Sequence, residues 1–267
     1  MYKNKKVLVT GGTSFIGSHL VDRLNDNKDF IGKSLISVVL PVHNEAKIIS
    51  EIIRLYFEWI CRKLPSVLVV AEDGSVDGTR EILFSLKQEI PMILLSDHKR
   101  KGYAKAVADA LRICDSDWIF FSDSDGQYHP SDFWKLWKNR NDYDMVIGRK
   151  IYRNERWHRI ILAKGFHMIV NYLFRLKLHD ADCGFRLIRR SVIQSVLDDV
   201  KFLKYSFWAE FTIRAALKGF RICEVPIKHY ARLHGDTHIY KLPKIPLIIL
   251  KQLKGLIKLY VDVRKRR

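Results

Sequence analysis

Apolar runs alternate with helical patterns from residue 35 to residue 123. The segment LISVVLPV (35–42) is a continuous, largely β-branched run, which predicts a strand buried on both faces. The segment EAKIISEIIRLYFEWICRKL (45–64) that follows it has the periodicity of an amphipathic helix. The same alternation then predicts strands at 66–72, 92–95 and 117–123, and helices from about Gly78 and over 103–113. This order is typical of an α/β fold in which helices cover a mostly parallel sheet.

Polar segments follow three of the predicted strands. The first strand is followed by PVHNE (41–45), the second by EDGSVDGT (72–79) and the last by SDSDGQ (122–127). Ligands of open α/β sheets bind beyond the carboxyl ends of the strands. Packing alone does not require carboxylates and turn-forming residues at three strand ends, so we expect a functional site there.

Asp123 and Asp125 are separated by one residue in a predicted turn. Two such carboxylates can bind one hard cation together with phosphate oxygens of a substrate, and Mg²⁺ or Mn²⁺ fits such sparse oxygen ligation. In isolation, the sequence Asp-Ser-Asp-Gly is better explained as a turn. The two other acidic strand ends at the same sheet edge favour the metal site.

Two further segments carry candidate donor-binding residues. Asp73 is placed to accept a hydrogen bond from a nucleobase N–H, although the same segment would also serve as a loop before a helix that starts near Asp77. The segment HKRKGYAKAV (98–107) is either a solvated basic loop or a diphosphate-binding loop, with Arg100, Lys101 and Lys105 arranged around Gly102.

Five segments together resemble family-two glycosyltransferases, most closely the branch of dolichol-phosphate mannosyltransferase and other polyprenyl-phosphate sugar synthases. In chain order they are SVVLPVHNEAKII, VVAEDGSVDGT, FFSDSDGQYHPSDF, DADCGFRLIRRSV and GFRICEVPIKHYARLHG. The resemblance covers roughly residues 34–240. It implies a GT-A fold, which is a Rossmann-like, mostly parallel sheet flanked by helices, and an inverting transfer from a nucleotide-sugar donor.

The resemblance also implies roles for individual residues. Asp123 and Asp125 match the metal-binding Asp-x-Asp, with Mg²⁺ or Mn²⁺ as the cofactor and Asp125 among the catalytic residues. Glu72 stands where many relatives have aspartate, which leaves the nucleotide base open. The donor-binding residues are expected to be Pro41, Val42, Asn44, Glu45, Glu72, Asp73, Lys101, Gly102, Lys105, Asp123 and Ser124.

On the acceptor side, Arg149 and Arg159 best match the family's phosphate-binding arginines, with Arg186 nearby. Ala163 stands where relatives often carry a serine, which weakens the assignment of a phosphate acceptor. A lipid phosphate is already an anionic nucleophile and requires no strong base, whereas a hydroxyl acceptor requires one. The candidate bases are acids that would otherwise serve at helix ends or in salt bridges, namely Asp180, Asp182 and Glu210.

The C-terminal segment PLIILKQLKGLIKLYVDVRKRR (246–267) predicts a basic amphipathic helix. Four lysines fall within an arc of roughly 60° on a helical wheel; they are Lys251, Lys254, Lys258 and Lys265. The far side carries Ile249, Leu253, Leu256, Ile257 and Tyr260. This pattern predicts an interfacial helix on anionic lipid, or a helix that packs its apolar face on the catalytic domain while the lysines are solvated.

Composition limits the partners and the compartment. The chain has 267 residues, a net charge of +18 and 48% hydrophobic residues, with no apolar stretch long enough to span a membrane. The four cysteines are far apart, which favours reduced thiols and a cytoplasmic protein that is peripheral on the cytosolic face of the membrane. The basic residues form no recognised nucleic-acid module, so anionic membrane lipid is the expected polyanion and nucleic acid is not.

The segment TGGTSFIGSHL (10–20) closely resembles the start of an NAD-dependent sugar-nucleotide epimerase. Gly11 and Gly17 match the first and last glycines of the motif, but Ser14 replaces the middle one. The next strand ends in Pro41 rather than in an acid that could bind ribose hydroxyls. Residues 1–33 are therefore interpreted as a truncated βα remnant, without NAD binding, ahead of a catalytic domain (34–240) and the C-terminal helix (241–267).

The leading hypothesis is a metal-dependent glycosyltransferase that moves a sugar from a nucleotide donor to a polyprenyl phosphate at the membrane surface. One alternative is transfer to a saccharide or lipid hydroxyl. Another is a non-catalytic membrane-surface protein that retains the fold, although the paired aspartates argue against it.

Overall fold

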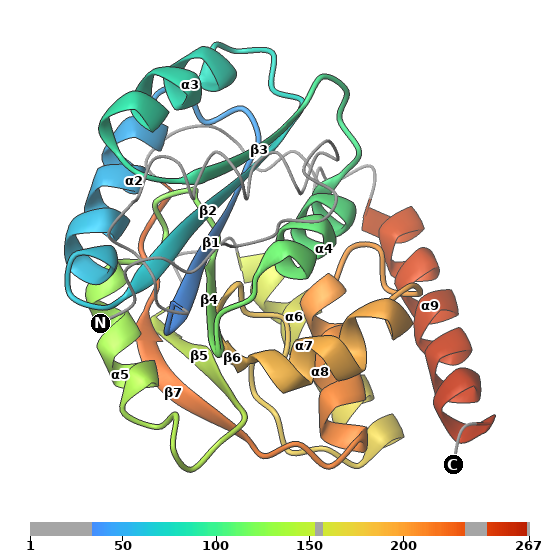
Figure 1. Ribbon diagram of the computed structural model, residues 1–267. Helices are drawn as coiled ribbons and strands as arrows, with labels where there is room; N and C mark the ends of the chain where they lie inside the picture. The colour runs from blue at the N-terminus through green and yellow to red at the C-terminus, as the bar shows by residue number, and fades with distance from the viewer. Residues whose placement is uncertain (1–33, 153–156, 233–244, 266–267) are drawn as a thin grey trace.

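The computed structural model describes residues 34–152, 157–232 and 245–265 (Figure 1). The expected epimerase-like remnant, 1–33, lies outside the described residues. The strands are β1 (Ile36–Val42), β2 (Ser66–Asp73), β3 (Ile93–Asp97), β4 (Trp118–Ser122), β5 (Met145–Tyr152), β6 (Phe185–Arg189) and β7 (Ile222–Lys228). The α-helices are α2 (Ile49–Tyr56), α3 (Thr79–Glu89), α4 (Tyr103–Ile113), α5 (Phe133–Trp137), α6 (Trp157–Phe174), α7 (Arg190–Val196), α8 (Phe207–Leu217) and α9 (Ile245–Lys265). Short helical turns are η1 (Phe57–Cys61), η2 (Pro130–Asp132) and η3 (Leu197–Asp199).

The strands form one seven-stranded sheet in the order β3-β2-β1-β4-β6-β5-β7. Strand β6 runs antiparallel to both β4 and β5, and the other pairs are parallel. The chain winds outward from β1 to β2 and β3, and then returns to place β4 on the other side of β1. The carboxyl ends of β1 and β4 therefore form a topological switch point, where open α/β sheets bind ligands. The predicted α/β fold with a mostly parallel sheet is confirmed.

The predicted elements correspond closely to the observed ones. All seven residues of β1 are buried, as expected for a central strand of a parallel sheet. The helix predicted over 45–64 is observed as α2, which continues into the single π-helical turn η1. The helix predicted over 103–113 is α4.

The main core fills both faces of the sheet, and helices α2 and α3 lie on one side of it in Figure 1. Phe120 is central to this core: its ring lies 4.9 Å from that of Phe133 and 4.8 Å from that of Phe185, in edge-to-face geometry. Phe121, its neighbour on β4, points to the other face and packs on Trp208 with ring centroids 4.5 Å apart. Strand β4 is thus held from both faces directly before the Asp123 turn.

A smaller second core joins α6, α8 and α9 (Figure 1). It is formed by Val170, Phe174, Leu203, Ala209, Ile213, Leu256 and Leu259. Beside it, Arg214 on α8 is buried and binds both Glu210, at 2.9 Å, and Asp262 on α9, at 2.8 Å. Helix α9 is therefore packed against the catalytic unit. Within the described ranges, no helix combines the length and apolarity needed to cross a bilayer.

Candidate active site

The loops after β1, β2 and β4 are joined into one framework by hydrogen bonds. Ser124 Oγ donates to the carbonyl of Pro41 at 2.5 Å, which ties the end of β4 to the end of β1. The Glu45 N–H donates to Thr79 Oγ1 at 2.9 Å, which ties the β1 loop to the start of α3. The three strand-end segments predicted from the sequence therefore meet at the switch point.

Asn44 shapes the β1 loop. Its φ of 56° lies in the left-handed region, which asparagine tolerates better than most residues. The Asn44 side-chain Oδ1 accepts from the Val76 N–H at 3.0 Å, and its backbone N–H donates to Ser75 Oγ at 3.0 Å. Pro41 and Val42 are the last two residues of β1 and are buried. The loop is thus rigidly placed beside the β2 turn.

Asp123 and Asp125 lie at the centre of the framework. The Asp123 N–H donates to the Gly184 carbonyl at 3.0 Å, and Tyr103 Oη donates to Asp123 Oδ1 at 2.8 Å. Asp125 Oδ1 accepts from the Gln127 N–H at 3.2 Å. Burial, with the charge of Asp125 added to it, raises the pKa of Asp123 to about 7, and burial also raises the pKa of Asp125.

Gly184 makes room for the Asp123 carboxylate. A Cβ at this position would lie 1.9 Å from Asp123 Oδ2. Only a residue without a side chain leaves the carboxylate in its observed place. The glycine of the "DCGFR" segment therefore shapes the acidic pair from a neighbouring strand.

The acidic pair fits a divalent cation that retains ligands from substrate and water. Two neighbouring carboxylates with raised pKa values gain from a cation that removes their repulsion. In the described part of the chain, no cluster of three or more histidine, cysteine or acidic side chains is arranged to hold a metal. The protein would thus supply only two ligands, as is common for Mg²⁺ bound with substrate phosphates.

Asp73 holds the basic loop that precedes α4. The carboxylate accepts from the Lys101 N–H at 2.7 Å and from the Gly102 N–H at 2.9 Å. Gly74, with φ of +62°, lets this loop approach closely, because a Cβ there would lie 2.4 Å from the Arg100 backbone nitrogen. Asp73 therefore has a structural role as well as the predicted role in base recognition.

Two residues expected to bind the donor are engaged elsewhere. Glu72 is buried and accepts from Ser96 Oγ at 2.7 Å and from Arg80 Nε at 3.2 Å. Lys101 Nζ is paired with Asp97 at 2.5 Å and Asp109 at 2.6 Å. Glu72 thus fastens β2 to its neighbours, and the Lys101 ammonium is paired with two carboxylates. Arg100 in the loop and Lys105 in the first turn of α4 are both exposed.

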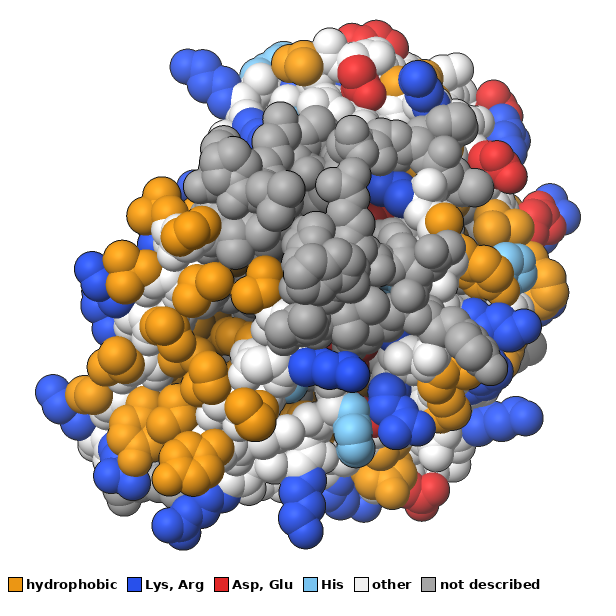
Figure 2. Space-filling view, turned by 180° about the vertical axis from the view of Figure 1, so that it is seen from behind, with side chains coloured by type: hydrophobic (Ala, Val, Ile, Leu, Met, Phe, Trp, Pro, Cys, Tyr) orange, Lys and Arg blue, Asp and Glu red, His pale blue; other side chains and the backbone are white. Residues whose placement is uncertain are grey.

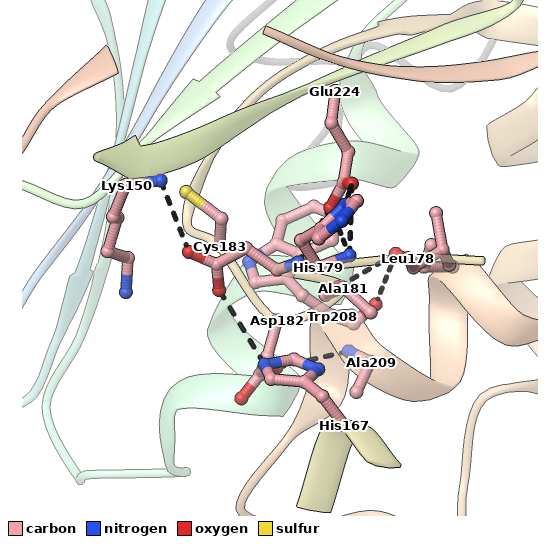
Figure 3. Close-up of polar contacts among 12 residues, drawn as sticks. Lys150, His167, Leu178, His179, Ala181, Asp182, Cys183, Trp208, Ala209 and Glu224 are labelled. Atoms are coloured by element: carbon pink, nitrogen blue, oxygen red, sulfur yellow. Dashed lines mark hydrogen bonds and ion pairs between the residues drawn. The ribbon is translucent and has the colours of Figure 1, made fainter. Parts of the chain in front are cut away.

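The loop 178–183, which carries two of the acids predicted near the acceptor, is held by several elements (Figure 3). Glu224 on β7 accepts from the His179 N–H at 2.9 Å and from the Asp180 N–H at 2.6 Å. Asp180 is buried, lies 3.8 Å from His167 Nε2 and accepts from the Lys150 N–H at 3.4 Å. Asp180 is therefore a bridge between β5 and α6.

Asp182 faces the start of α8 and accepts from the Ala209 N–H at 3.0 Å (Figure 3). Burial raises its pKa to about 6. Unlike Asp180, Asp182 is partly exposed. Of the three acids predicted near the acceptor, it is the one that is partly exposed, as proton transfer to or from a ligand requires.

Glu210 and Arg186, both predicted near the acceptor, lie in the interior. The Glu210 carboxylate is fully buried, and it accepts from the backbone N–H groups of Lys201, Phe202 and Leu203. The Arg186 guanidinium is also fully buried and donates to the Cys183 carbonyl and to Thr212 Oγ1. Both side chains are thus held by hydrogen bonds within the fold, and their predicted roles toward an acceptor stay predictions.

A family model described as "Glycosyl transferase family 2" matches residues 37–197. The chain belongs to glycosyl transferase family 2. It is 28% identical over 214 residues to the polyprenol monophosphomannose synthase of Mycolicibacterium smegmatis, covering 74% of this chain and 78% of that protein. It is 28% identical over 221 residues to glycosyltransferase AglD of Haloferax volcanii, covering 76% of this chain but only 34% of AglD.

Solved structures show the same fold. Glucosyl-3-phosphoglycerate synthase from Mycobacterium tuberculosis, in complex with Mn²⁺, UDP and phosphoglyceric acid, superposes with a TM-score of 0.64 at 18% identity. The match covers 90% of this chain and 82% of that one. S. aureus TarS 1–349 in complex with UDP gives a TM-score of 0.56 at 19% identity, covering 73% of this chain and 60% of that one. The chain is thus a GT-A glycosyltransferase.

Three site residues of this family-2 enzyme were not predicted from the sequence. Trp208 Nε1 donates to Tyr103 Oη at 3.0 Å, and Tyr103 in turn holds Asp123. The positive charge of Lys150 opposes the rise in the pKa of Asp123, Asp125 and Asp182. Lys150 directly follows Arg149, and Tyr103 directly follows Gly102. These two residues could have been found from their position next to predicted site residues.

Two positions complete the site. Arg232 is paired with Glu45. The arginine lowers the pKa of Glu45, but burial has the larger effect and the pKa is raised. Arg149, at the end of β5, is partly buried beside Lys150. The side chain of Arg159, in the first turn of α6, lies outside the described residues, so its predicted contact with a phosphate stays a prediction.

Proposed function

We propose that this glycosyltransferase moves a sugar from a nucleotide-sugar donor to a polyprenyl phosphate at the cytosolic surface of a membrane. The observation that carries the proposal is the partly buried pair Asp123 and Asp125 at the switch point, with the cationic side chain of Lys150 near both. A metal-bound diphosphate on one side of this pair and an anionic acceptor on the other would match this distribution of charge. The similarity to a polyprenol monophosphomannose synthase supports the same acceptor class.

The donor would lie across the ends of β1, β2 and β4. Pro41, Val42 and Asn44 provide the wall on which the nucleoside would rest, and Asp73 would use the free lone pairs of its carboxylate to accept from the base. Mg²⁺ or Mn²⁺ on Asp123 and Asp125 would neutralise the charge that gathers on the departing diphosphate. Lys105, at the start of α4, is placed to add a second positive charge.

The acceptor phosphate would be held by cationic side chains of β5 and α6. Lys150 on β5 lies near the acidic pair, and Arg159 is the predicted partner from α6. Arg149 directly precedes Lys150 in the strand, so its side chain points to the opposite face, and its contact with the phosphate stays a prediction. A phosphate oxygen is already anionic, so it can attack the anomeric carbon without a strong general base. This removes the need for Glu210, which is committed to the fold.

Thermal unfolding in the presence of ligands tests the donor class and the metal site in one experiment. We expect one nucleotide-sugar in a panel of UDP-, GDP- and dTDP-sugars to raise Tm in the presence of Mn²⁺. A ligand at about 100 times its Kd adds roughly 2.7 kcal/mol to the free energy of unfolding. NAD should give no shift.

Asp125→Asn is the matched variant, because it preserves shape and removes one charge. The Mn²⁺-dependent shift should disappear in this variant, while Tm without ligand stays close to that of the wild type or rises as repulsion with Asp123 is relieved. A shift of equal size in the variant would contradict the metal assignment. A shift with NAD alone would contradict the proposed donor.

A second acceptor class is favoured by one observation, the raised pKa of Asp182 at a partly exposed position. Such a group can act as general base toward a saccharide or lipid hydroxyl. Asp182→Asn separates the two reactions. With a polyprenyl phosphate as acceptor the variant should retain substantial transfer, whereas with a hydroxyl acceptor kcat should fall by about 10²–10⁴-fold.

A further inference from the structure

Helix α9 presents one face to the catalytic unit. Ile248, Leu256 and Leu259 on this face are buried. Gln252 Nε2, on the same face, donates to Ser206 Oγ at 2.6 Å. At Gly255 a Cβ would lie 2.8 Å from the carbonyl oxygen of Phe202, so the helix approaches this loop as closely as a glycine allows. The inward face of α9 is therefore fixed against α8 and the loop before it.

The opposite face of α9 carries a second apolar stripe, which is exposed. Leu250, Leu253, Ile257 and Val261 are spaced three or four residues apart and so share one side of the helix. Their exposed fractions are 50%, 40%, 62% and 45%. Packing within the catalytic unit does not account for this stripe, because the inward face already fills the second core.

Helix α6 extends the exposed apolar surface. Met168 and Tyr172, one turn apart, are 70% and 84% exposed. Helices α6 and α9 pack together through Phe174 and Tyr260, whose ring centroids lie 6.0 Å apart. Figure 2 shows hydrophobic side chains gathered on the side of the molecule where α9 lies, with Lys and Arg side chains around them.

Basic residues adjoin this surface on both helices. Lys251, Lys254, Lys258 and Lys265 form a stripe next to the exposed apolar residues of α9, and Lys164 and Arg175 are exposed on or just after α6. The one acidic residue within α9, Asp262, is turned inward and paired with Arg214. The described part of α6 contains no acidic residue. The surface is therefore apolar at its centre and positively charged at its edge.

We propose that this α6–α9 surface, formed by Met168, Tyr172, Leu250, Leu253, Ile257 and Val261 with their basic neighbours, binds an anionic lipid bilayer. The apolar side chains would enter the boundary between headgroups and acyl chains, and the lysines would contact lipid phosphates. Charge favours lipid over a second copy of the chain, because two copies meeting on this face would bring two lysine stripes together. The surface extends the proposed function, since a polyprenyl acceptor is itself embedded in a membrane.

Co-sedimentation of the full chain with vesicles tests the surface directly. The chain should bind vesicles of phosphatidylcholine mixed with phosphatidylglycerol, and bind phosphatidylcholine alone at least about tenfold more weakly. The double substitution Leu253→Glu with Ile257→Glu should lower affinity for the anionic vesicles by about tenfold or more. Both side chains are exposed, so Tm of the double variant should stay near that of the wild type.

Phe84→Glu is the matched control. Phe84 is 52% exposed on α3, away from α6 and α9, so an added charge there should leave vesicle binding within about twofold of wild type after correction for net charge. Equal loss in the control and in the double variant would overturn the proposal. Unchanged vesicle binding by the double variant would also overturn it. A third outcome would overturn it as well: the wild type forms a dimer in solution and does not bind vesicles, and the double substitution dissociates that dimer.

Transfer to a short, water-soluble polyprenyl phosphate separates this proposal from the proposed function. The double variant should retain wild-type transfer to the short acceptor and lose transfer to a long acceptor in vesicles. Vesicle binding by the wild type without transfer to any polyprenyl phosphate would support the surface and overturn the proposed acceptor. Transfer to the short acceptor without any vesicle binding would overturn the surface alone.

Discussion

The surroundings of each carboxylate in this glycosyltransferase determine whether it is available to a ligand or stabilises the fold. Asp123 and Asp125 share a partly buried site in which burial raises the pKa of both, and the charge of Asp125 adds to the rise at Asp123. Glu72 and Glu210 are at least as well buried but receive hydrogen bonds from fixed donors of the fold. A carboxylate whose donors are all supplied internally stabilises the framework, whereas one that lacks them is available to a ligand.

The raised pKa of Asp182 predicts that the difference in stability between the wild type and Asp182→Asn depends on pH. The folded-state value of about 6 lies above the ordinary value of 3.8, so the folded protein binds this proton more tightly than the unfolded chain does. The stabilisation that results is complete below about pH 4 and is lost as the pH rises through 6. In metal-free protein, Asp182→Asn should therefore match the wild type near pH 4 and exceed it by about 1–3 kcal/mol at pH 8. Unfolding measured across this range with a chelator present checks the prediction, and a constant difference would contradict it.

The candidate site could be predicted only in part at this scale. Asp123 and Asp125 were identified because they follow a long apolar strand, and strand ends are fixed by periodicity. The partners of Glu210 and Arg186 could not be predicted, because the N–H groups of residues 201–203 and Thr212 come from other segments. Tyr103 and Trp208 were missed because an aromatic residue at a helix start is typical of a core.

At the scale of elements, α9 differs most from its prediction. The sequence places Leu256 and Tyr260 on the same side as Ile249, Leu253 and Ile257. The structure separates them, because α6 and α8 cover one part of that side and leave the rest exposed. A helical wheel gives the angles of side chains but not the position of the neighbouring helices. The single apolar side predicted from the sequence is therefore observed as one buried stripe and one exposed stripe.

Two helical glycines provide a comparison of packing. Gly165 in α6 has no heavy atom within 4 Å of an added Cβ, whereas at Gly255 in α9 that Cβ would meet the Phe202 backbone at 2.8 Å. Gly165→Ala should raise the free energy of unfolding by about 0.5–1 kcal/mol through helix propensity. Gly255→Ala should lower it by about 1–3 kcal/mol because the helix must shift outward. Chemical denaturation of both variants measures the difference; stabilisation at both sites would show that α9 packs less closely than described.

For the whole molecule, a net charge of +18 acts together with the arrangement of the helices. The α/β class of the fold was predictable, because strands and helices alternate along the chain from residue 35 to residue 123. The surface on which this charge is concentrated was not predictable, because it depends on which lysines lie next to exposed apolar residues. The structure concentrates four lysines beside the outer stripe of α9.

Salt should therefore affect lipid and donor binding differently. Raising NaCl from about 0.1 M to about 1 M shortens the Debye length from about 10 Å to about 3 Å, which screens exposed lysines far more than buried carboxylates. Vesicle affinity should fall by about tenfold or more, while the Mn²⁺-dependent rise in Tm with the nucleotide-sugar should persist. Equal sensitivity of both readouts would indicate that the lysines of α9 do not contribute specifically.

The double pairing of Arg214 has a mechanical consequence. Because this buried guanidinium joins Glu210 on α8 to Asp262 on α9, the last helix cannot swing away without leaving a buried charge half-paired. A bilayer that holds α9 would thus also set the tilt of the sheet. Encounter with a lipid-borne acceptor would then be a search in two dimensions, in which the enzyme rotates only about the membrane normal.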